Sequence, residues 1–257
     1  GQNFLQDDNI INNIIELSGG LRDKNVLEIG GGTGNLTERI IKERPKKLIV
    51  LEIDNDLIPT LQKLENLNKQ NVKVVSGDIL KFNILEYFLQ PPIIIGNLPY
   101  NISTEILTKW IINLGSKIWF EKLVLMFQKE VADRIISNHN SSNYGRLSII
   151  SNWRLNVKKI IDIEPTSFKP IPKVESTLLV FEPKKKYFRL KKPQSIEKIT
   201  KIFFNQRRKK IKKPIKKIFN NSEKIAEKLN IDLNLRPQNL DFETYYRIAD
   251  EFEKLDK

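Results

Sequence analysis

The first half of the chain alternates short apolar segments with segments of helical periodicity. Between the apolar segments, residues 36–44 and 56–67 have apolar side chains at every third or fourth position, which indicates amphipathic helices. The apolar segments carry such side chains on both faces, as strands buried on both sides do, so the alternation predicts a parallel sheet covered by helices. The predicted strands are residues 25–30, 47–54, 72–78, 91–97 and 122–128.

The pattern changes twice further along the chain. Two more predicted strands, residues 155–163 and 175–183, are joined by a proline-rich loop without a helix, which favours an antiparallel pair at the sheet edge. After about Lys184 the strand signals end, and residues 195–219, 222–231 and 241–255 have helical patterns. The sequence therefore predicts an α/β domain over residues 1–184 and a small helical domain over residues 185–257.

The net charge of +13 is concentrated in one segment. Residues 184–217 contain sixteen Lys or Arg and one acid, which leaves the remainder of the chain at −2. A clustered basic excess favours contact with nucleic acid. The alternative is a solvated charged face in a chain rich in lysine.

Composition excludes several kinds of site. The chain has no cysteine, and its one histidine, His139, lies in the polar stretch SNHNSSN, so we expect no disulfide, no metal site and no catalytic histidine. No apolar run approaches the roughly 20 residues of a membrane span, and no signal-peptide pattern opens the sequence. We therefore expect a soluble, cytoplasmic protein, and a monomer because no exposed apolar repeat is evident.

The first predicted strand ends in the glycine-rich stretch LEIGGGTGN. Glycine permits sharp turns and a close approach of the backbone to a ligand. The dinucleotide-binding fingerprint requires Gly or Ala where Asn35 stands. The stretch instead matches E-x-G-x-G-x-G, with Glu28, Gly30, Gly32 and Gly34, which is the pattern of S-adenosylmethionine-dependent methyltransferases of the Rossmann-like class.

The next two predicted strands end in acids. Glu52 follows Gly30 by 22 positions, where a carboxylate can accept hydrogen bonds from both hydroxyls of a ribose. Asp78 can accept a hydrogen bond from an adenine amine. Each acid alone has an equally good alternative as a helix N-cap, but their agreement in order along the sheet favours a nucleoside-containing cofactor.

The fourth strand ends in NLPY, which resembles motifs of enzymes that methylate a conjugated amine. The Asn97 side-chain oxygen and the Leu98 carbonyl can accept the two N–H bonds of such an amine. Pro99 stiffens the loop and adds no donor, and Tyr100 offers a ring on which an extruded base can stack. Phe168, in TSFKPIP, is the candidate for the second stacking face. A plain turn, with both aromatic residues in the core, is the alternative.

Taken together, these motifs resemble the ribosomal RNA adenine N6-dimethyltransferase family, and most closely its small-subunit branch. The resemblance implies a Rossmann-like methyltransferase domain followed by a helical RNA-contacting domain, with S-adenosylmethionine as cofactor. It also implies dimethylation of two adjacent adenines in a hairpin near the 3′ end of small-subunit RNA, within the 30S subunit or its precursor. The stretches that carry it are GQNFL, VLEIGGGTGNLT, LEID, GDIL, NLPYNIS, QKEVADRI, YGRLS, SFKPIPKVEST, FNQRRKKIKK and RPQNLDFETYYRIA.

The same resemblance implies which residues contact the cofactor, and it leaves alternatives open. By motif, the cofactor contacts are Asn3, Leu5, Gly30, Glu52, Asp78 and Asn97. The large-subunit RNA methyltransferases of macrolide resistance share GQNFL and the NLPY-type loop, but the last two stretches resemble the small-subunit branch. A DNA adenine methyltransferase is less consistent, because Asp-Pro-Pro-Tyr and a target-recognition domain are not visible. A non-catalytic ribosome assembly factor is the remaining alternative.

Overall fold

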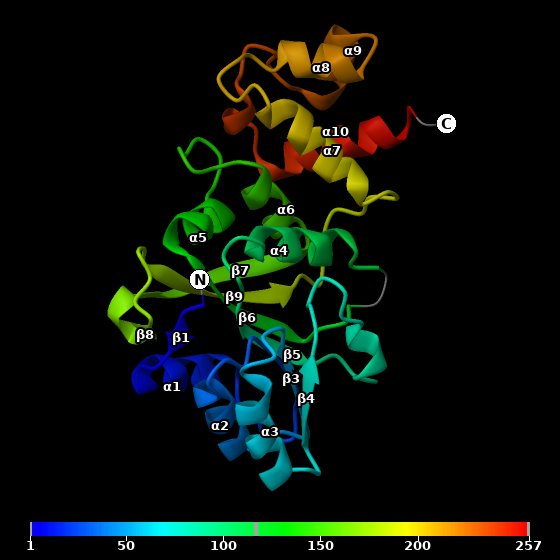
Figure 1. The fold of residues 1–257 in the computed structure, drawn as a ribbon. Coiled ribbons are helices and arrows are strands. Elements are labelled where there is room, and N and C mark those ends of the chain that lie inside the picture. Colours follow the sequence, from blue (N-terminus) through cyan, green and yellow to red (C-terminus); the bar gives the residue numbers. More distant parts are fainter. Residues whose placement is uncertain (1, 116–117, 256–257) are drawn as a thin grey trace. The chain divides into compact units, whose positions relative to one another are not determined.

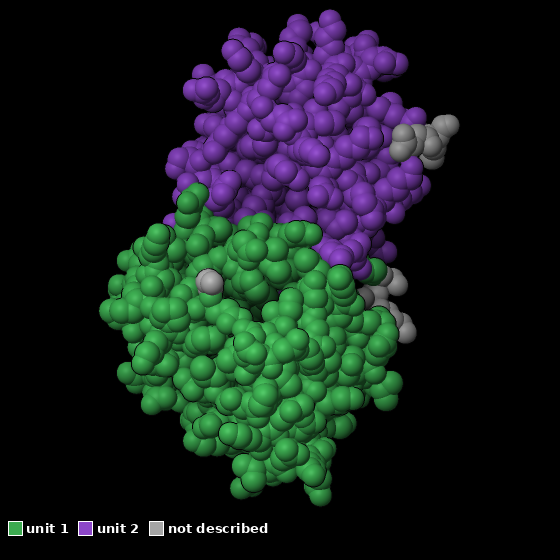
Figure 2. Space-filling model, in the orientation of Figure 1, with its two compact units in different colours: residues 1–106, 114–132, 158–183 green, residues 107–113, 133–157, 184–257 purple. Residues whose placement is uncertain are grey.

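A computed structural model describes residues 2–115 and 118–255, and these residues form two compact units (Figure 2). Unit 1 comprises residues 1–106, 114–132 and 158–183, and unit 2 comprises residues 107–113, 133–157 and 184–257. No helix among the described residues is long and apolar enough to cross a membrane.

The main sheet has seven strands in the order β4-β3-β2-β5-β6-β9-β7 (Figure 1). The first five strands in this order are parallel, and β9 pairs antiparallel with β6, so the predicted parallel sheet is confirmed. The predicted late strands also form, with β9 inside the sheet and β7 at its edge. The strands are β2 (Asn25–Ile29), β3 (Lys47–Glu52), β4 (Val72–Ser76), β5 (Ile93–Asn97), β6 (Lys122–Gln128), β7 (Leu155–Ile163) and β9 (Ser176–Pro183).

The first three helices bury their apolar faces against strands of the sheet. In α1, Ile10 and Ile14 join a core cluster that also contains Val26 of β2 and Val50 of β3. The Asp7 side chain caps α1 by accepting from the backbone N–H groups of the first turn. The helices on this part of the chain are α1 (Asp8–Leu17), α2 (Asn35–Lys42), α3 (Ile58–Leu67), α4 (Ser103–Ile112) and α5 (Lys129–Ile136).

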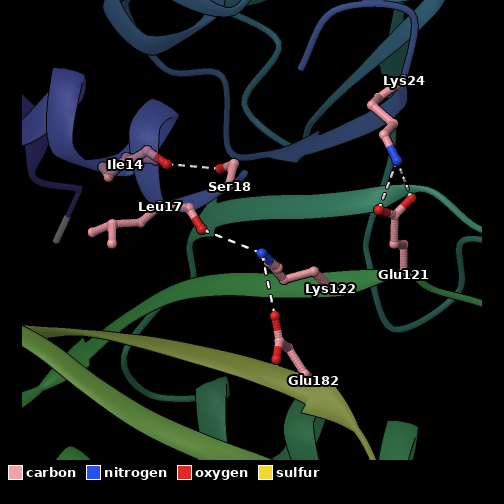
Figure 3. A network of polar contacts seen from close by, with 7 residues as sticks. All are labelled: Ile14, Leu17, Ser18, Lys24, Glu121, Lys122 and Glu182. Atoms are coloured by element: carbon pink, nitrogen blue, oxygen red, sulfur yellow. Dashed lines mark hydrogen bonds and ion pairs between the residues drawn. The ribbon is translucent and has the colours of Figure 1, made fainter. Parts of the chain in front are cut away.

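The C-terminal end of α1 is tied to the strands by a polar network (Figure 3). Ser18 Oγ donates to the Ile14 carbonyl at 2.7 Å. Lys122 Nζ lies 3.5 Å from the Leu17 carbonyl and 3.3 Å from Glu182 Oε1. A cation at the carbonyl end of a helix is favourable, because the unpaired carbonyl groups there carry partial negative charge. The network therefore fixes the C-terminal end of α1.

A two-residue ribbon stands apart from the main sheet. The strands β1 (Phe4–Leu5) and β8 (Phe168–Lys169) pair antiparallel, with Leu5 opposite Phe168. Gln6 N–H extends this pairing by donating to the Ser167 carbonyl at 2.9 Å. The ribbon joins the start of the chain to the proline-rich loop that precedes β9.

Unit 2 has an aromatic core. The ring of Tyr245 lies 5.5 Å from that of Phe203 and 5.8 Å from that of Phe204, and Tyr144 packs against Phe204 and Phe242. The unit contains α6 (Arg146–Arg154), α7 (Gln194–Phe204), α8 (Lys212–Ile218), α9 (Ser222–Leu229) and α10 (Phe242–Glu253).

The prediction of one helix over residues 195–219 is wrong, because the chain turns between α7 and α8. The backbone N–H groups of Ile211 and Lys212 bond to the carbonyls of Leu235 and Leu233, outside the helix. Pro214 lies in the first turn of α8, where a missing N–H is tolerated, whereas a continuous helix would place it in the interior. A continuous helix would also place like charges four positions apart, Arg208 with Lys212 and Lys209 with Lys213.

The predicted domain boundary after residue 184 stays a prediction, because the compact units divide the chain differently. Residue 183 is the last residue of unit 1, but residues 107–113 and 133–157 group with unit 2. The reason for the second segment is aromatic and polar packing onto the later helices. Tyr246 Oη, for example, donates to the Ile149 carbonyl of α6 at 3.1 Å.

Candidate active site

A cavity of about 150 Å³ lies at the carboxyl ends of β2, β3, β4 and β5 in unit 1. We call it the carboxyl-end cavity; a hollow in unit 1 is visible in Figure 2. Because these strands are parallel, the segments that follow them meet at one edge of the sheet. The cavity is lined by residues 2–5, 29–33, 35, 36, 51–53, 77–79, 97–100, 102 and 126.

The glycine-rich loop after β2 needs glycine for two separate reasons. Gly30 has a φ of +75°, in the left-handed region, and its N–H donates to the Leu51 carbonyl of β3 at 2.8 Å. Gly32 has a φ of +55°, and a Cβ there would lie 2.7 Å from the Phe4 ring. The loop therefore exposes backbone atoms without side chains to the cavity, and the ring of Phe4 packs against Gly32.

Two side-chain amides hold the start of the chain against the cavity. Asn35 Nδ2 donates to the Leu5 carbonyl at 3.1 Å, and Asn97 Nδ2 donates to the Asn3 carbonyl at 2.8 Å. Both Asn3 and Leu5 line the cavity, as the sequence predicts for cofactor contacts. Asn35, after β2, and Asn97, at the end of β5, therefore hold residues 3–5 in place as one wall of the cavity.

The acids predicted at the ends of β3 and β4 both line the cavity. Glu52 is only 4% exposed, and its Oε2 accepts from Gly32 N–H at 2.9 Å. Its Oε1 accepts from Ile53 and Asp54 N–H at 2.9 and 3.0 Å. Backbone donors therefore orient this carboxylate and stabilise its charge.

Asp78 is oriented by a turn instead of a helix. Its Oδ1 accepts from Leu80 N–H at 2.9 Å, and no α-helix directly follows β4 in the described chain. The alternative role of helix N-cap therefore does not apply to Asp78. Its Oδ2 remains as an acceptor for a ligand.

A third acid, Glu28, lies behind the glycine loop and is fully buried. Burial raises its pKa to about 8, a hydrogen bond from Thr37 opposes the shift, and the nearby Glu52 charge adds to it. Thr37 Oγ1 donates to Glu28 Oε2 at 2.7 Å, while Glu28 Oε1 has no hydrogen-bond partner. Burial therefore favours the protonated, neutral form of Glu28. Glu52, by contrast, lines the cavity.

The most informative atom of the cavity is Asn97 Oδ1. It is buried and has no hydrogen-bond partner, although the amide nitrogen of the same side chain is bonded to Asn3. An unpaired buried acceptor costs about 1–3 kcal/mol, and such atoms call for a specific explanation. Because Asn97 lines the cavity, a ligand donor there would satisfy this oxygen.

The tyrosine of NLPY is held in place by a residue of β9. Tyr100 lines the cavity, and its Oη lies 2.6 Å from Ser176 Oγ at the start of β9. Ser176 is fully buried. Burial raises the pKa of Tyr100, so its hydroxyl stays protonated and the ring is neutral.

Phe168 lies elsewhere than its predicted role requires. It is 2% exposed and packs in the core cluster with Ile10, Ile14 and Leu178, and it does not line the carboxyl-end cavity. Its place in β8, opposite Leu5, turns the ring into this core. In the described structure no face of the ring is open for stacking, so this structure does not support the prediction.

Sequence reasoning missed two residues that shape the cavity. Asn35 was noted only because it breaks the dinucleotide fingerprint, although its position at the start of α2 signals an amide near the strand ends. Ser176 has no local signal, because its contact with Tyr100 joins residues 76 positions apart. His139 is exposed and lies outside the cavity lining, in agreement with its polar surroundings in the sequence.

Comparison with known proteins assigns the family. The model of the ribosomal RNA adenine dimethylase family matches residues 1–254. The chain belongs to this family. It is 55% identical over 255 residues to a protein of Pelagibacter ubique (strain HTCC1062) named ribosomal RNA small subunit methyltransferase A, covering 99% of this chain and 96% of that protein. A protein of Ehrlichia ruminantium (strain Gardel) with the same name is 38% identical over 250 residues, covering 96% and 94%.

Solved structures agree with this membership. A dimethyladenosine transferase from Plasmodium falciparum matches with a TM-score of 0.84 and 28% identity over 98% of each chain. The 23S rRNA methyltransferase ErmE shares the fold, with a TM-score of 0.72, 23% identity and coverage of 99% of this chain and 100% of that one. The adenine dimethylase family and its Rossmann-like fold imply S-adenosylmethionine as the cofactor.

The residues of the cavity fit this cofactor. Glu52 and Asp78 supply acceptors for ribose hydroxyls and for an exocyclic amine, and the glycine loop allows close approach. The apolar side chains of Ile53 and Ile79 line the space beside these acids. The predicted fold class, family and cofactor are thus confirmed.

Proposed function

We propose that this protein is an rRNA adenine N6-dimethyltransferase that modifies two adjacent adenines in a hairpin near the 3′ end of small-subunit RNA. The cofactor would be held by residues 3, 5, 30, 52, 78 and 97, all of which line the carboxyl-end cavity. When bound, S-adenosylmethionine would supply an electrophilic methyl group and be left as a neutral thioether. The amine, positively charged after the transfer, would release its acidic proton to solvent, so the site needs no strong base.

The observation that carries the proposal is the unpaired acceptor of Asn97. In the proposed complex, Asn97 Oδ1 accepts one N–H of the adenine N6 amine, and the carbonyl of Leu98 accepts the other. The N6 lone pair is otherwise delocalised into the ring, and two acceptors favour the pyramidal nitrogen in which it is localised. The bond from Asn97 Nδ2 to Asn3 fixes which atom of the amide faces the amine. Catalysis then rests on positioning and electrostatics.

Pro99 and Tyr100 complete the proposed target site. Pro99 has no N–H to compete for the two acceptors, and its ring limits the motion of the loop. Tyr100 provides a neutral ring against which the extruded adenine stacks, held at the rim by Ser176. Phe168 would have to leave the core to provide a second face, so we do not assign it that role.

Small-subunit RNA is the proposed substrate because both curated relatives are named as small-subunit methyltransferases. ErmE supports only the common fold, since its identity is 23%. We further propose that the substrate is the 30S subunit or its precursor and that the protein acts as a monomer in the cytoplasm. A non-catalytic assembly role is disfavoured by the intact Asn97, Pro99 and Tyr100.

The basic segment of unit 2, residues 184–217, would bind phosphates around the target hairpin. Its residues differ in how available they are for such contacts. Arg207 is engaged with Gln238 Oε1 at 3.2 Å and with the carbonyls of Ser141 and Ser142. Arg207 therefore stabilises the packing of unit 2. The exposed lysines 209, 210, 212 and 213 are better placed to contact RNA. Phosphate contacts of this kind position RNA without reading its sequence.

Methyl transfer from labelled S-adenosylmethionine to purified small subunits that lack the modification tests the function. Large-subunit RNA is assayed in parallel, and nucleosides are analysed by mass spectrometry. We expect N6,N6-dimethyladenosine in small-subunit RNA only. Label in large-subunit RNA would favour the resistance-type activity, and cofactor binding without transfer to either RNA would leave an assembly role.

A further inference from the structure

A second concave surface lies at the opposite ends of the same strands. It has a volume of about 490 Å³ and is lined by residues 25, 46, 47, 69–73 and 87–90. These residues belong to the starts of β2, β3 and β4 and to the segment before β5. We call this surface the amino-end groove. All of its lining belongs to unit 1.

The lining of the amino-end groove is basic. Lys46, Lys47, Lys69 and Lys73 contribute ammonium groups, and the described lining contains no Asp or Glu. Three of the four, Lys46, Lys69 and Lys73, are exposed, while Lys47 is half-buried. Four cations around one concavity repel one another unless an anion is bound. A fold that gathers them from separate segments therefore favours an anionic ligand.

Aromatic residues hold two of these lysines in place. Lys47 Nζ donates to the Tyr87 carbonyl at 2.5 Å and lies 5.6 Å from the centre of the Phe88 ring. Lys73 Nζ lies 5.4 Å from the centre of the Tyr87 ring, which stacks on Phe82 at 4.7 Å. Cation–π contacts reduce the mobility of a long side chain, so these ammonium groups are partly preorganised.

The groove also offers hydrogen-bond acceptors. Asn25 Nδ2 donates to the Gln90 carbonyl and Asn71 Nδ2 to the Pro45 carbonyl, both at 3.3 Å. These bonds use the donor side of each amide and orient its oxygen as an acceptor. A ligand that combines phosphates with hydroxyl groups satisfies both the lysines and the amide oxygens, and RNA, with its 2′-hydroxyls, is such a ligand.

We propose that the amino-end groove is a second RNA-binding site, which binds the phosphate backbone of the RNA away from the target adenines. The inference rests on the proposed action on small-subunit RNA. Lys47 and Glu52 mark the two ends of β3, so the groove and the carboxyl-end cavity are separated by roughly 17 Å of strand. One nucleotide cannot occupy both, so the groove holds a different stretch of RNA from the target adenine.

The test compares two variants of the full chain with equal loss of charge. The first combines Lys46→Gln, Lys69→Gln and Lys73→Gln. Lys47 is kept because it is half-buried and donates to the Tyr87 carbonyl. The control combines exposed lysines of unit 1 that line neither surface. These control substitutions are Lys42→Gln, Lys63→Gln and Lys81→Gln.

Equilibrium binding to unmodified small subunits is measured without methyl transfer, over a series of salt concentrations. Each lost phosphate contact lowers the slope of log K against log salt by roughly 0.7–0.9, so the groove variant should lose about 2 in slope. We expect its affinity to fall about tenfold or more near 0.1 M salt, with the control within about threefold of wild type. Affinity for S-adenosylmethionine should be unchanged in both variants, which checks the fold.

An unchanged affinity and slope in the groove variant would overturn the proposal. Equal losses in the two variants would also overturn it, because the effect would then be one of net charge. This binding measurement does not depend on catalysis. If the wild-type protein transferred no methyl group but bound subunits through these lysines, the proposed function would be wrong and the proposed RNA-binding role of the groove would still hold.

Discussion

The two ends of one parallel sheet carry opposite chemistry. At the carboxyl ends of the strands, Glu52, Asp78 and Asn97 offer oxygen acceptors to the carboxyl-end cavity. At the amino ends, lysines surround an open groove. The same strand, β3, supplies Lys47 to one surface and Glu52 to the other.

The two surfaces therefore differ in selectivity: one recognises a particular ligand, and the other binds phosphates without selecting among them. The acceptors are oriented by backbone and amide donors, so they select a ligand by the position of its hydroxyl and amine groups. The lysines bind any phosphate nearby, and their contribution depends on salt. We therefore expect substitutions at the carboxyl ends to change cofactor affinity and transfer rate, and substitutions of lysines to change RNA affinity alone.

The largest effect on stability is expected at Glu28, behind the cavity. Its pKa is raised to about 8, so the folded state holds a proton that the unfolded state releases above about pH 4.3. The stability that protonated Glu28 contributes is fully present below the pKa of the unfolded state. It is lost as the pH rises toward and through the pKa of the folded state. At about 1.4 kcal/mol per pH unit, the unfolding free energy should lose about 3 kcal/mol between pH 5 and pH 7 from this group.

Glu28→Gln removes this titration, and urea unfolding at pH 5 and pH 7 measures it. The loss of stability over that interval should be about 3 kcal/mol smaller in the variant than in wild type. Glu16→Gln, at an exposed position on α1, is the control and should behave as wild type. Parallel pH profiles for Glu28→Gln and wild type would contradict the assignment of a neutral Glu28.

Glu52→Gln tests the acceptors of the cavity. The new amide must turn its nitrogen toward backbone donors that now face a carboxylate, and it loses the charge that strengthens hydrogen bonds to ribose. We expect affinity for S-adenosylmethionine to fall about 10- to 100-fold, measured by calorimetry. Asp56→Asn removes one charge from the same loop outside the cavity lining and should leave affinity unchanged. Equal affinities for Glu52→Gln and wild type would refute the cofactor contact.

Substitutions of the lysines of unit 2 should change RNA affinity and leave cofactor affinity unchanged. Replacing Lys209, Lys210, Lys212 and Lys213 by Gln should weaken binding to small subunits about tenfold and lower the salt slope by about 2. The slope change is smaller than four contacts imply because Lys210 bonds to Asn234 and Lys212 pairs with Glu223. Cofactor affinity should not change. A salt slope equal to that of wild type would remove this segment from the RNA contact.

The smallest effect is expected at Ser176, which holds the target-site tyrosine. Ser176→Ala removes the partner of Tyr100 Oη and should slow methyl transfer about fivefold, the cost of roughly 1 kcal/mol for one hydrogen bond. Tyr100→Phe should produce the same loss, and the double variant should be no slower than either. Additive losses would show that the two residues act separately.

The parallel sheet and its functional strand ends could be predicted because their signals are local. Apolar runs mark the buried strands, and the residue after each run falls at the carboxyl edge whatever the remaining packing. Glu52, Asp78, Asn97 and Tyr100 were found in this way, and all four line the cavity.

The features that the sequence did not reveal depend on contacts between distant segments. Phe168 is drawn into the core by pairing between β1 and β8, across more than 160 positions. The break between α7 and α8 is stabilised by backbone bonds to Leu233 and Leu235. The amino-end groove was hidden for the same reason: outside residues 184–217 the chain has a charge of only −2, yet folding gathers four lysines from separate segments.

The central claim is that Asn97 Oδ1 holds the target amine, and single-turnover methyl transfer by Asn97→Ala tests it most directly. Asn35→Ala is the matched control, since it removes the other amide that pins the start of the chain but no target acceptor. We predict that Asn97→Ala slows transfer about 100- to 1000-fold at saturating cofactor, while Asn35→Ala weakens cofactor binding and transfers within about fivefold of wild type. Equal transfer rates for the two variants at saturating cofactor would contradict the account.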